Sequence, residues 1–313
     1  MRNGRREGIQ LAKLCLGTVQ FGMKYGINNQ EGQPTEEACF EMLDIAIEKG
    51  IDVIDTARAY GTAEIVLGNY LEYRKCHYKV DIISKLRPNV LETGEKDVYS
   101  AIRKELEDTL KRLHVSQLKG YLLHTSEYVY DERIVETLFR LKDENLIQNV
   151  GVSIYDMKEG YEAIKKHMDY IQLPYSVFDQ RGTQSELIEK AKKAGMVIFT
   201  RSAFLQGLYM MELEKIPYHL EHSKKYLRHF EDLIKQYKKN KVELLLQFVR
   251  NSENIDYLVF GVDNKEQLLE DIEVVERDEK IEEDLVSEIR GYYSQVEESI
   301  ILPSLWSNGR KAE

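Results

Sequence analysis

Four polar side chains of complementary chemistry follow apolar, strand-like segments in the first half of the sequence. Asp55 ends the segment IDVID, and Tyr60 lies five residues beyond it. Lys85 ends VDIISK, and His124 ends GYLLH. A phenol beside an ammonium group can exchange a proton with a carbonyl oxygen near neutral pH, because the cation stabilises phenolate and lowers the pKa of the phenol. Asp55 would keep Lys85 charged and oriented, while His124 would hydrogen-bond the same oxygen.

This group of side chains can move a proton, but none of them can supply a hydride. Reduction of a carbonyl would therefore require a nicotinamide cofactor. A buried ion pair between Asp55 and Lys85 is the alternative interpretation, since these residue types are rarely buried without a partner. That alternative leaves Tyr60 and His124 unexplained, so the residues favour a reactive site.

The segments that carry these side chains belong to an alternation of short apolar runs and longer amphipathic runs. This alternation predicts right-handed βαβ units and a parallel sheet. Eight strands are expected, which is the number that a (β/α)₈ TIM barrel requires, with catalytic groups at the carboxyl ends of the strands. A doubly wound open sheet is the rival α/β fold, but the Gly-rich turn G-x-G-x-x-G does not occur. The expected strands are residues 12–17, 51–56, 80–85, 120–124, 147–153, 170–176, 196–202 and 256–262.

The pattern predicts a single domain rather than two. The barrel is expected over residues 1–300, with a C-terminal tail over residues 301–313. A long loop is expected after the seventh strand, over residues 205–240, where it would hang over the mouth of the barrel. An extra helix is expected at residues 282–295, after the helix that follows the last strand.

Composition narrows the class of protein further. The formal net charge of −10 disfavours nucleic acid and anionic membranes as partners. No apolar run approaches the roughly 20 residues that span a bilayer, and no signal-peptide core follows the basic N-terminus, so a cytoplasmic protein is expected. Three scattered cysteines do not form a disulfide framework or a zinc site, and the pair His219 and His222 lacks the H-E-x-x-H pattern, so no metal site is predicted.

The sequence resembles the aldo-keto reductase family over about nine-tenths of its length. The matching motifs are, in family order, LGTVQFG (16–22), IDVIDTARAYGTAE (51–64), ISK (83–85), LLH (122–124), GVS (151–153), QLPYS (172–176) and FGVDNKEQLLED (260–271). The resemblance implies that Tyr60 is the general acid in reduction. It also implies that Asp55, Lys85 and His124 complete a catalytic tetrad in a (β/α)₈ barrel. LGTVQFG and RSAFLQGL further resemble a bacterial branch associated with sugar or polysaccharide metabolism.

The resemblance also implies a cofactor site along the mouth of the barrel. NADP(H) is the expected cofactor, with NAD(H) as the alternative. Three positions depart from the usual family residues: Ile154 replaces an asparagine, Arg201 replaces an aromatic residue that stacks on nicotinamide, and Gln267 replaces an arginine that clamps a 2′-phosphate. Asp263 would repel that phosphate unless Lys265 or another cation offsets it. The implied cofactor contacts are Gly17, Thr18, Asp55, Ser153, Gln172, Arg201, Ser202, Phe204, Leu205, Gln206, Gly207, Gly261, Val262, Asn264, Gln267, Glu270 and Asp271.

The predicted activity is NAD(P)H-dependent interconversion of a carbonyl (aldehyde, ketone or sugar) and its alcohol, with Tyr60 as general acid and base. A cofactor-binding regulatory or sensor barrel with slow or no turnover is the alternative. Arg58 and the neighbouring pair Thr125 and Ser126 point to a hydroxylated or anionic carbonyl compound. The substrate pocket is expected to include Gln20, Phe21, Tyr25, Arg58, Thr125, Ser126 and the long loop after residue 207.

Overall fold

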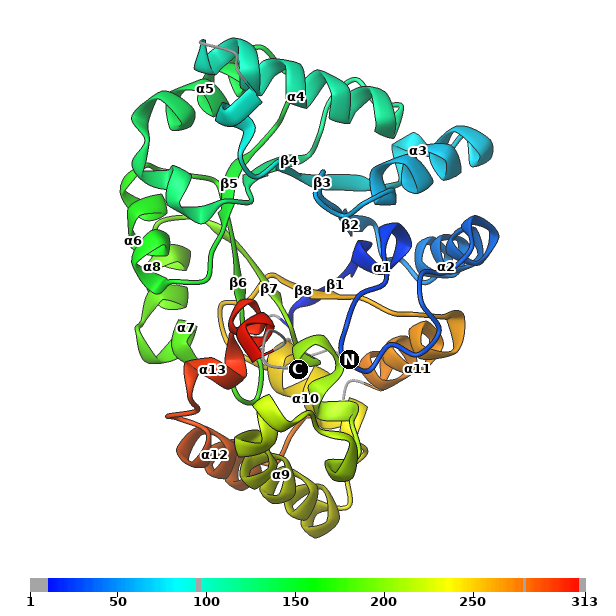
Figure 1. The fold of residues 1–313 in the computed structure, drawn as a ribbon, viewed down its shortest axis with the longest axis vertical. Helices are drawn as coiled ribbons and strands as arrows, with labels where there is room; N and C mark the ends of the chain where they lie inside the picture. Colours follow the sequence, from blue (N-terminus) through cyan, green and yellow to red (C-terminus); the bar gives the residue numbers. More distant parts are fainter. Residues whose placement is uncertain (1–10, 94–96, 278–279, 310–313) are drawn as a thin grey trace, which may run out of the picture.

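Eight parallel strands form one closed barrel in which each strand pairs with its neighbours in chain order (Figure 1). The structure is a computed structural model that describes residues 11–93, 97–277 and 280–309. It confirms the predicted (β/α)₈ TIM barrel, with every strand inside its expected segment or within one residue of it. The strands are β1 (Lys13–Gly17), β2 (Val53–Asp55), β3 (Asp81–Leu86), β4 (Gly120–Leu123), β5 (Val150–Ser153), β6 (Tyr170–Pro174), β7 (Val197–Arg201) and β8 (Tyr257–Phe260).

Helices follow the strands and form the outer ring of the barrel (Figure 1). The principal ones are α2 (Glu36–Glu48), α3 (Ala63–Arg74), α4 (Val98–Leu113), α5 (Glu132–Asp143), α6 (Met157–Lys165), α8 (Leu187–Lys193), α10 (Lys241–Arg250) and α11 (Lys265–Glu276). In α4, for example, Ile102, Leu106 and Leu110 recur every four residues and are buried. Such an apolar stripe packs a helix against the sheet. Short helices are α1 (Val19–Gly22), α7 (Arg181–Gln184) and the 3₁₀ helices η1 (His77–Lys79), η2 (Val90–Thr93) and η3 (Ser126–Tyr130).

A small apolar cluster fills the inside of the barrel, separate from the larger core beneath the helices. Its members are Cys15, Val53, Ile83, Leu122, Tyr170, Phe199 and Val259. Side chains along a strand alternate between two faces, so a residue two positions further on points the same way. Asp55, Lys85, His124, Gln172 and Arg201 each follow a member of the cluster by two residues. The period of the strands therefore places them at the carboxyl end of the barrel, directly beyond the inner core.

The long interval after β7 contains more regular structure than the predicted loop. It holds the 3₁₀ helices η4 (Leu205–Met210), η5 (Leu213–Lys215) and η6 (Tyr218–Ser223), followed by α9 (Lys224–Tyr237). Tyr226, Leu227, Phe230 and Leu233 are buried on one side of α9, and this spacing explains why a helix forms there.

The C-terminal segment packs against this insertion. The extra helix is confirmed as α12 (Glu283–Tyr292) and is followed by α13 (Glu298–Ile301) and η7 (Pro303–Gly309). Figure 1 shows α9, α12 and α13 on the same side of the barrel. Tyr293 donates a hydrogen bond to the carbonyl of Tyr226, and its ring lies 4.9 Å from that of Phe178. η7 lies within the segment expected to form the C-terminal tail, and its Trp306 is only 4% exposed. Residues 1–10 and 310–313 of the predicted domain and tail lie outside the described residues.

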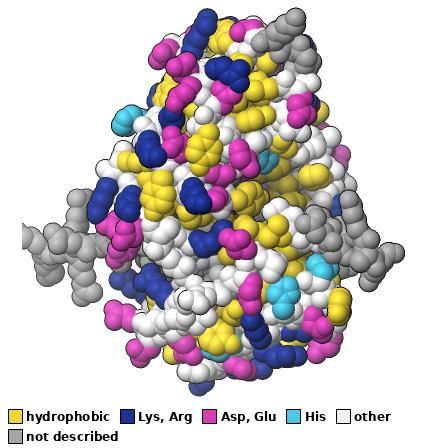
Figure 2. All heavy atoms as spheres, turned by 60° about the vertical axis from the view of Figure 1, so that its left-hand side comes forward, with side chains coloured by type: hydrophobic (Ala, Val, Ile, Leu, Met, Phe, Trp, Pro, Cys, Tyr) yellow, Lys and Arg dark blue, Asp and Glu magenta, His cyan; other side chains and the backbone are white. Residues whose placement is uncertain are grey.

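No described helix is both long and apolar enough to cross a membrane. Figure 2 shows lysine and arginine side chains interspersed with aspartate and glutamate over one face of the molecule, without a continuous basic patch among the residues described there.

The loop that carries Tyr60 is held by two glycines in close contact. A Cβ at Gly22, the last residue of α1, would overlap the carbonyl oxygen of Tyr60, and a Cβ at Gly61 would overlap the carbonyl oxygen of Gly22. Gly61 also adopts a φ of +54°, a conformation that favours glycine. Thr62 donates its backbone N–H to Gly22. The position of the Tyr60 backbone therefore depends on the absence of side chains at these two positions.

We predict that Gly22→Ala lowers the free energy of unfolding by about 1–3 kcal/mol, because an added methyl group forces the α1 backbone away from the Tyr60 loop. Gly291→Ala is the control: it lies in α12, and no atom lies within 4 Å of an added Cβ. Since alanine is the better helix former, this control should raise stability by about 0.5–1 kcal/mol. Denaturant unfolding of both variants measures the effects, and an equally stable Gly22→Ala protein would contradict the packing argument.

Candidate active site

The side chain of Lys85 is the centre of the site and is completely buried. Its Nζ donates hydrogen bonds to Asp55 Oδ2 at 2.6 Å, to the carbonyl of Thr56 at 3.0 Å and to the hydroxyl of Tyr60 at 3.3 Å. These three acceptors match the three donors of an ammonium group. The structure thus brings Asp55, Tyr60 and Lys85 together as the sequence predicted.

A hydrogen-bond chain extends from Asp55 to the opposite wall of the barrel. Gln172 Nε2 donates to Asp55 Oδ1 at 2.7 Å, and Ser153 Oγ donates to Gln172 Oε1 at 3.1 Å. Both oxygens of the Asp55 carboxylate are therefore occupied. Such a fully partnered buried network holds its members in one arrangement.

His124 completes the group beside Tyr60. Its ring stands edge-on to that of Tyr60, with centroids 5.7 Å apart and an interplanar angle of 88°. Burial, together with the positive charges of Lys85 and Arg201, lowers the pKa of His124 to about 3. The imidazole is therefore neutral, with one ring nitrogen as donor and the other as acceptor. Its Nδ1 is buried and has no hydrogen-bond partner among the described residues.

The pKa of Tyr60 is raised, whereas the sequence predicted that the neighbouring Lys85 would lower it. Burial raises this pKa above 10, and the nearby Lys85 ammonium opposes the rise without cancelling it. Burial also opposes the charged form of Lys85, but attraction to Asp55 and Tyr60 outweighs it, so the pKa of Lys85 is raised. In the protein as described, a neutral phenol therefore faces a charged ammonium. The phenol holds its proton at neutral pH, which suits a proton donor.

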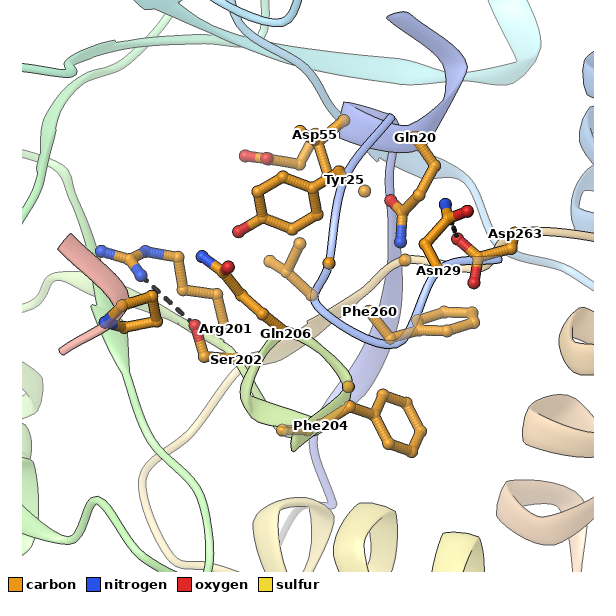
Figure 3. Close-up of a pocket in the computed structure, with 18 of the residues that line it drawn as sticks. Gln20, Tyr25, Asn29, Asp55, Arg201, Ser202, Phe204, Gln206, Phe260 and Asp263 are labelled. Atoms are coloured by element: carbon orange, nitrogen blue, oxygen red, sulfur yellow. Dashed lines mark hydrogen bonds between the residues drawn. The ribbon is translucent and has the colours of Figure 1, made fainter. Parts of the chain in front are cut away.

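The tetrad stands at one end of a cavity of about 590 Å³ at the carboxyl side of the barrel. Figure 3 shows Arg201 and Asp263 on opposite sides of this cavity, with Tyr25 and Gln206 between them. We call it the long cavity. Of the predicted catalytic and cofactor residues, those that line it are Gly17, Thr18, Asp55, Tyr60, His124, Ser153, Arg201, Ser202, Phe204, Gln206, Gly207, Gly261, Gln267, Glu270 and Asp271.

Five of the predicted residues do not line the long cavity. Lys85 and Gln172 are fully buried and act on it through Tyr60 and Asp55. Leu205 and Val262 are packed in the hydrophobic core. Asn264 instead caps α11, where its Oδ1 accepts a hydrogen bond from the N–H of Gln267. These last three positions lie in matching motifs, but their side chains serve packing and helix capping.

Sequence reasoning missed several residues that line the long cavity. Asn28 and Asn29 belong to the loop between α1 and α2, and Tyr155 follows β5. Pro303 and Ser304 come from η7, more than 240 residues from Tyr60 in sequence. The composition of the segment INNQEGQP could have indicated a turn, but nothing in the sequence indicates that this turn or the C-terminus reaches the cavity.

Arg201 lies at the edge of the long cavity, near His124. Its guanidinium carbon is 4.2 Å from the centre of the Tyr155 ring, and it donates hydrogen bonds to the carbonyl of Ile154 and to Ser202 Oγ. These contacts hold the guanidinium plane in place.

A second cavity, of about 1080 Å³, begins beyond His124. It shares His124, Tyr155 and Ser304 with the long cavity. Of the predicted substrate residues, Gln20 and Tyr25 line the long cavity, while Thr125 and Ser126 line the second cavity. Phe21 is buried in the core, and Arg58 lies 3.3 Å from Glu105 in an ion pair. Neither Phe21 nor Arg58 lines either cavity.

Comparisons with known proteins agree with this arrangement. The model of the Aldo/keto reductase family matches residues 13–293. The chain belongs to the aldo/keto reductase family. Members of this family are NAD(P)-dependent oxidoreductases that act on small carbonyl compounds and typically use NADP(H).

Two proteins of Bacillus subtilis (strain 168) are similar in sequence to this aldo/keto reductase. Aldo-keto reductase YhdN is 27% identical over 190 residues, which span 58% of this chain and about half (55%) of that protein. Uncharacterized oxidoreductase YrpG is 24% identical over 301 residues, which span 87% of this chain and 89% of that protein. Among solved structures, aldo-keto reductase AKR11C1 from Bacillus halodurans, in its holo form, has the same fold. It gives a TM-score of 0.71 at 19% identity and covers 90% of this chain and 92% of that chain.

The long cavity of this aldo/keto reductase fits an extended dinucleotide. Gly207 has a φ of +90°, and its hydrogen faces Asn28, so this glycine lets the loop after β7 approach the loop after α1 closely at the cavity wall. Gln20 Oε1 is buried and has no hydrogen-bond partner among the described residues. Ser153 and Arg201 line the end near the tetrad, while Gln267 and Asp271 of α11 line the other end. Polar groups are therefore available at both ends and along one side.

We predict that Asp55→Asn destabilises this aldo/keto reductase by about 3–5 kcal/mol at pH 7, because the buried Lys85 ammonium loses its counter-ion. In the wild type, Lys85 has a raised pKa, so its contribution is complete below the unfolded value near 10.4 and is lost as the pH rises through the folded value. In the variant, burial is unopposed and the folded pKa falls. The stability deficit should therefore shrink as the pH rises from 7 to 10.

Denaturant unfolding at several pH values tests this prediction. Asp52→Asn is the matched control, since Asp52 is exposed just before β2, and it should change stability by less than about 0.5 kcal/mol. A deficit that is small, or that grows with pH, would contradict the assignment of Lys85 as a buried cation held by Asp55.

Proposed function

We propose that this aldo/keto reductase catalyses the NAD(P)H-dependent reduction of a small aldehyde, ketone or sugar to its alcohol, and the reverse oxidation. One observation carries the proposal: the completely buried Lys85 ammonium contacts both the Asp55 carboxylate and the Tyr60 hydroxyl at the end of the long cavity. A phenol, an ammonium and a neutral imidazole at one end of a dinucleotide-sized cavity meet the requirements of carbonyl reduction.

Tyr60 is the proton donor in this proposal. Its hydroxyl gives a proton to the carbonyl oxygen, and the phenolate left behind is stabilised by Lys85 at 3.3 Å. A bound nicotinamide dinucleotide supplies the hydride. His124, which is neutral, donates its ring N–H to the same oxygen. Asp55 keeps Lys85 charged, and Gln172 holds the Asp55 carboxylate in place.

The residues that line the second cavity favour a substrate that is hydroxylated and uncharged. It continues from His124, so the part of a substrate beyond the carbonyl has space there. Hydroxyl groups of Thr125 and Ser126 line it, together with the carboxylates of Glu127, Asp156, Glu159 and Glu298. Arg181 also lines it, but its charge is shared between Asp179 at 2.7 Å and Glu298 at 4.0 Å. Hydroxyl and carboxylate groups bind sugar hydroxyls, whereas the excess of negative charge disfavours anions. An aldose therefore fits this cavity better than a sugar phosphate.

We predict that Tyr60→Phe lowers kcat for carbonyl reduction by at least about 100-fold, while the affinity for the reduced cofactor changes little. The substitution removes only the hydroxyl group that transfers the proton. Steady-state oxidation of NADH and NADPH with a panel of aldehydes and aldoses measures turnover, and fluorescence titration measures cofactor binding.

Tyr25→Phe is the matched control, because Tyr25 lines the same cavity but has no hydrogen bond to Lys85. Its kcat should stay within about tenfold of wild type. Near wild-type turnover by Tyr60→Phe would remove Tyr60 from the proposed role. A wild-type protein that binds the cofactor but turns over no carbonyl in the panel would favour the regulatory or sensor alternative.

We predict that kcat/KM for an unmodified aldose exceeds that for its 6-phosphate by at least about tenfold at low salt, and that higher salt narrows the ratio by screening the carboxylates. Asp156→Asn should raise the kcat/KM of the phosphate ester selectively, since asparagine preserves the cap of α6. Asp131→Asn is the control, because Asp131 caps α5 and does not line either cavity. A preference for the phosphate ester in the wild type would contradict this choice of substrate.

A further inference from the structure

The end of the long cavity that lies opposite Arg201 is lined by several acidic side chains (Figure 3). Asp263, Glu270 and Asp271 line this end, where the chain passes from β8 into α11. Arg201 is the one cationic side chain among the described residues that line the long cavity, and it lies at the opposite side, beside Tyr155 (Figure 3). The far end of the cavity is therefore lined by carboxylates without a lysine or arginine.

Asp263 is held in the cavity wall by neighbouring groups. Burial raises the pKa of Asp263 above its usual value, and the hydrogen bond that its Oδ1 accepts from Asn29 Nδ2 at 2.9 Å opposes this rise by favouring the charged form. The N–H of Gly32 donates to Asn29 Oδ1 at 2.6 Å, so the amide is oriented by its own turn. Glu31, in the same turn, adds further negative charge near Asp263. The orientation of Asp263 is thus part of the folded loop and does not depend on a ligand.

Lys265 is the cation that could offset this negative charge, but its side chain pairs with another helix. Lys265 Nζ donates to Glu41 Oε2 at 3.1 Å, on α2, and its side chain is half exposed. The side chain of Gln267 is also engaged within the protein, because its Oε1 accepts a hydrogen bond from the N–H of Asp263 at 2.8 Å. Neither side chain presents a positive charge to the cavity.

Asp271 gives an independent sign that a polar ligand binds at this end. It is 4% exposed, lines the long cavity and makes no side-chain hydrogen bond to the described residues. A buried polar group without a partner costs free energy, so a ligand with hydrogen-bonding groups is the natural complement. Burial, assisted by Glu270, raises the pKa of Asp271 to about 8, which leaves a proton on this carboxyl at neutral pH.

We propose that this aldo/keto reductase binds the dinucleotide without a 2′-phosphate, NAD(H), more tightly than NADP(H), because acidic side chains, and no lysine or arginine, line the end of the cavity that receives the adenosine. The inference rests on the proposed function, which places the nicotinamide beside Tyr60. A carboxylate accepts hydrogen bonds from ribose hydroxyls, whereas a 2′-phosphate requires an arginine or another cation. The family typically uses NADP(H), so the proposal sets this chain apart from the usual preference.

Direct binding measurements test the inference without relying on turnover. Trp306 is the single tryptophan of the chain, and it lies in η7, whose Pro303 and Ser304 line the long cavity. Its fluorescence should therefore report titrations with NADH and NADPH, and calorimetry provides a second measurement. We expect NADH to bind at least tenfold more tightly than NADPH at low salt. The ratio should narrow as salt rises, since screening weakens the repulsion of the phosphate.

Two variants test whether the side chains at positions 263 and 267 cause the preference for NADH. Asp263→Asn removes one charge while keeping an oxygen that can accept from Asn29, and it should tighten NADPH binding by at least fivefold with less than twofold change for NADH. Gln267→Arg adds a cation at the same place and should shift the ratio further toward NADPH. Glu266→Gln is the matched control, because Glu266 is exposed in the same helical turn and does not line the cavity. It should leave the ratio within twofold of wild type.

The outcomes separate the inference from the proposed function. NADPH binding as tight as or tighter than NADH binding in the wild type would overturn the inference and leave the proposed function standing. The inference would likewise be overturned, and the proposed function would stand, if neither Asp263→Asn nor Gln267→Arg altered the ratio of NADH affinity to NADPH affinity. Absence of binding of both dinucleotides would overturn the proposed function and the inference together.

Discussion

The buried ion pair between Lys85 and Asp55 is the interaction on which the rest of the site depends. An ammonium group inside a barrel loses its hydration, and this loss must be offset by nearby acceptors. Asp55, the carbonyl of Thr56 and the Tyr60 hydroxyl provide them. Parallel pairing of β2 with β3 places the two charged residues on adjacent strands. The chemistry proposed for Tyr60 is thus a consequence of how the protein accommodates a buried cation.

This pair also ties opposite walls of the barrel together. Asp55 on β2 is bonded to Gln172 on β6, and the two residues are 117 positions apart. The contact requires a barrel narrow enough for side chains from facing strands to meet. The number of strands and their stagger set that width, and the inner cluster around Tyr170 and Phe199 fills the interior. One set of strands therefore supplies packing in its middle and reactive groups at its carboxyl ends.

The outer walls of the long cavity come from different elements than the tetrad. Asp55 and Lys85 lie on strands, His124 directly follows one and Tyr60 lies in the loop after β2. The outer walls come from the loop before α2, the insertion after β7 and the C-terminal η7. Loops and insertions are free to differ between proteins that share a barrel. Family membership therefore accounts for the class of reaction, while the charges of Asp263 and Asp156 are the basis of the cofactor and substrate preferences proposed above.

The sequence by itself determined the barrel and the order of its strands, and it predicted the four residues that we propose as a tetrad. Period-two alternation and the rule that catalytic groups follow barrel strands act over a few residues, so they can be read along the chain. Asp55, Tyr60, Lys85 and His124 were all identified in this way. The tertiary structure decided what depends on distant partners. It showed that Lys265 turns to Glu41, that Arg58 pairs with Glu105, and that Asn264 caps a helix. It also showed that burial outweighs Lys85 in raising the pKa of Tyr60. Burial and pairing arise from residues far apart in sequence, and only the folded chain brings those residues into contact.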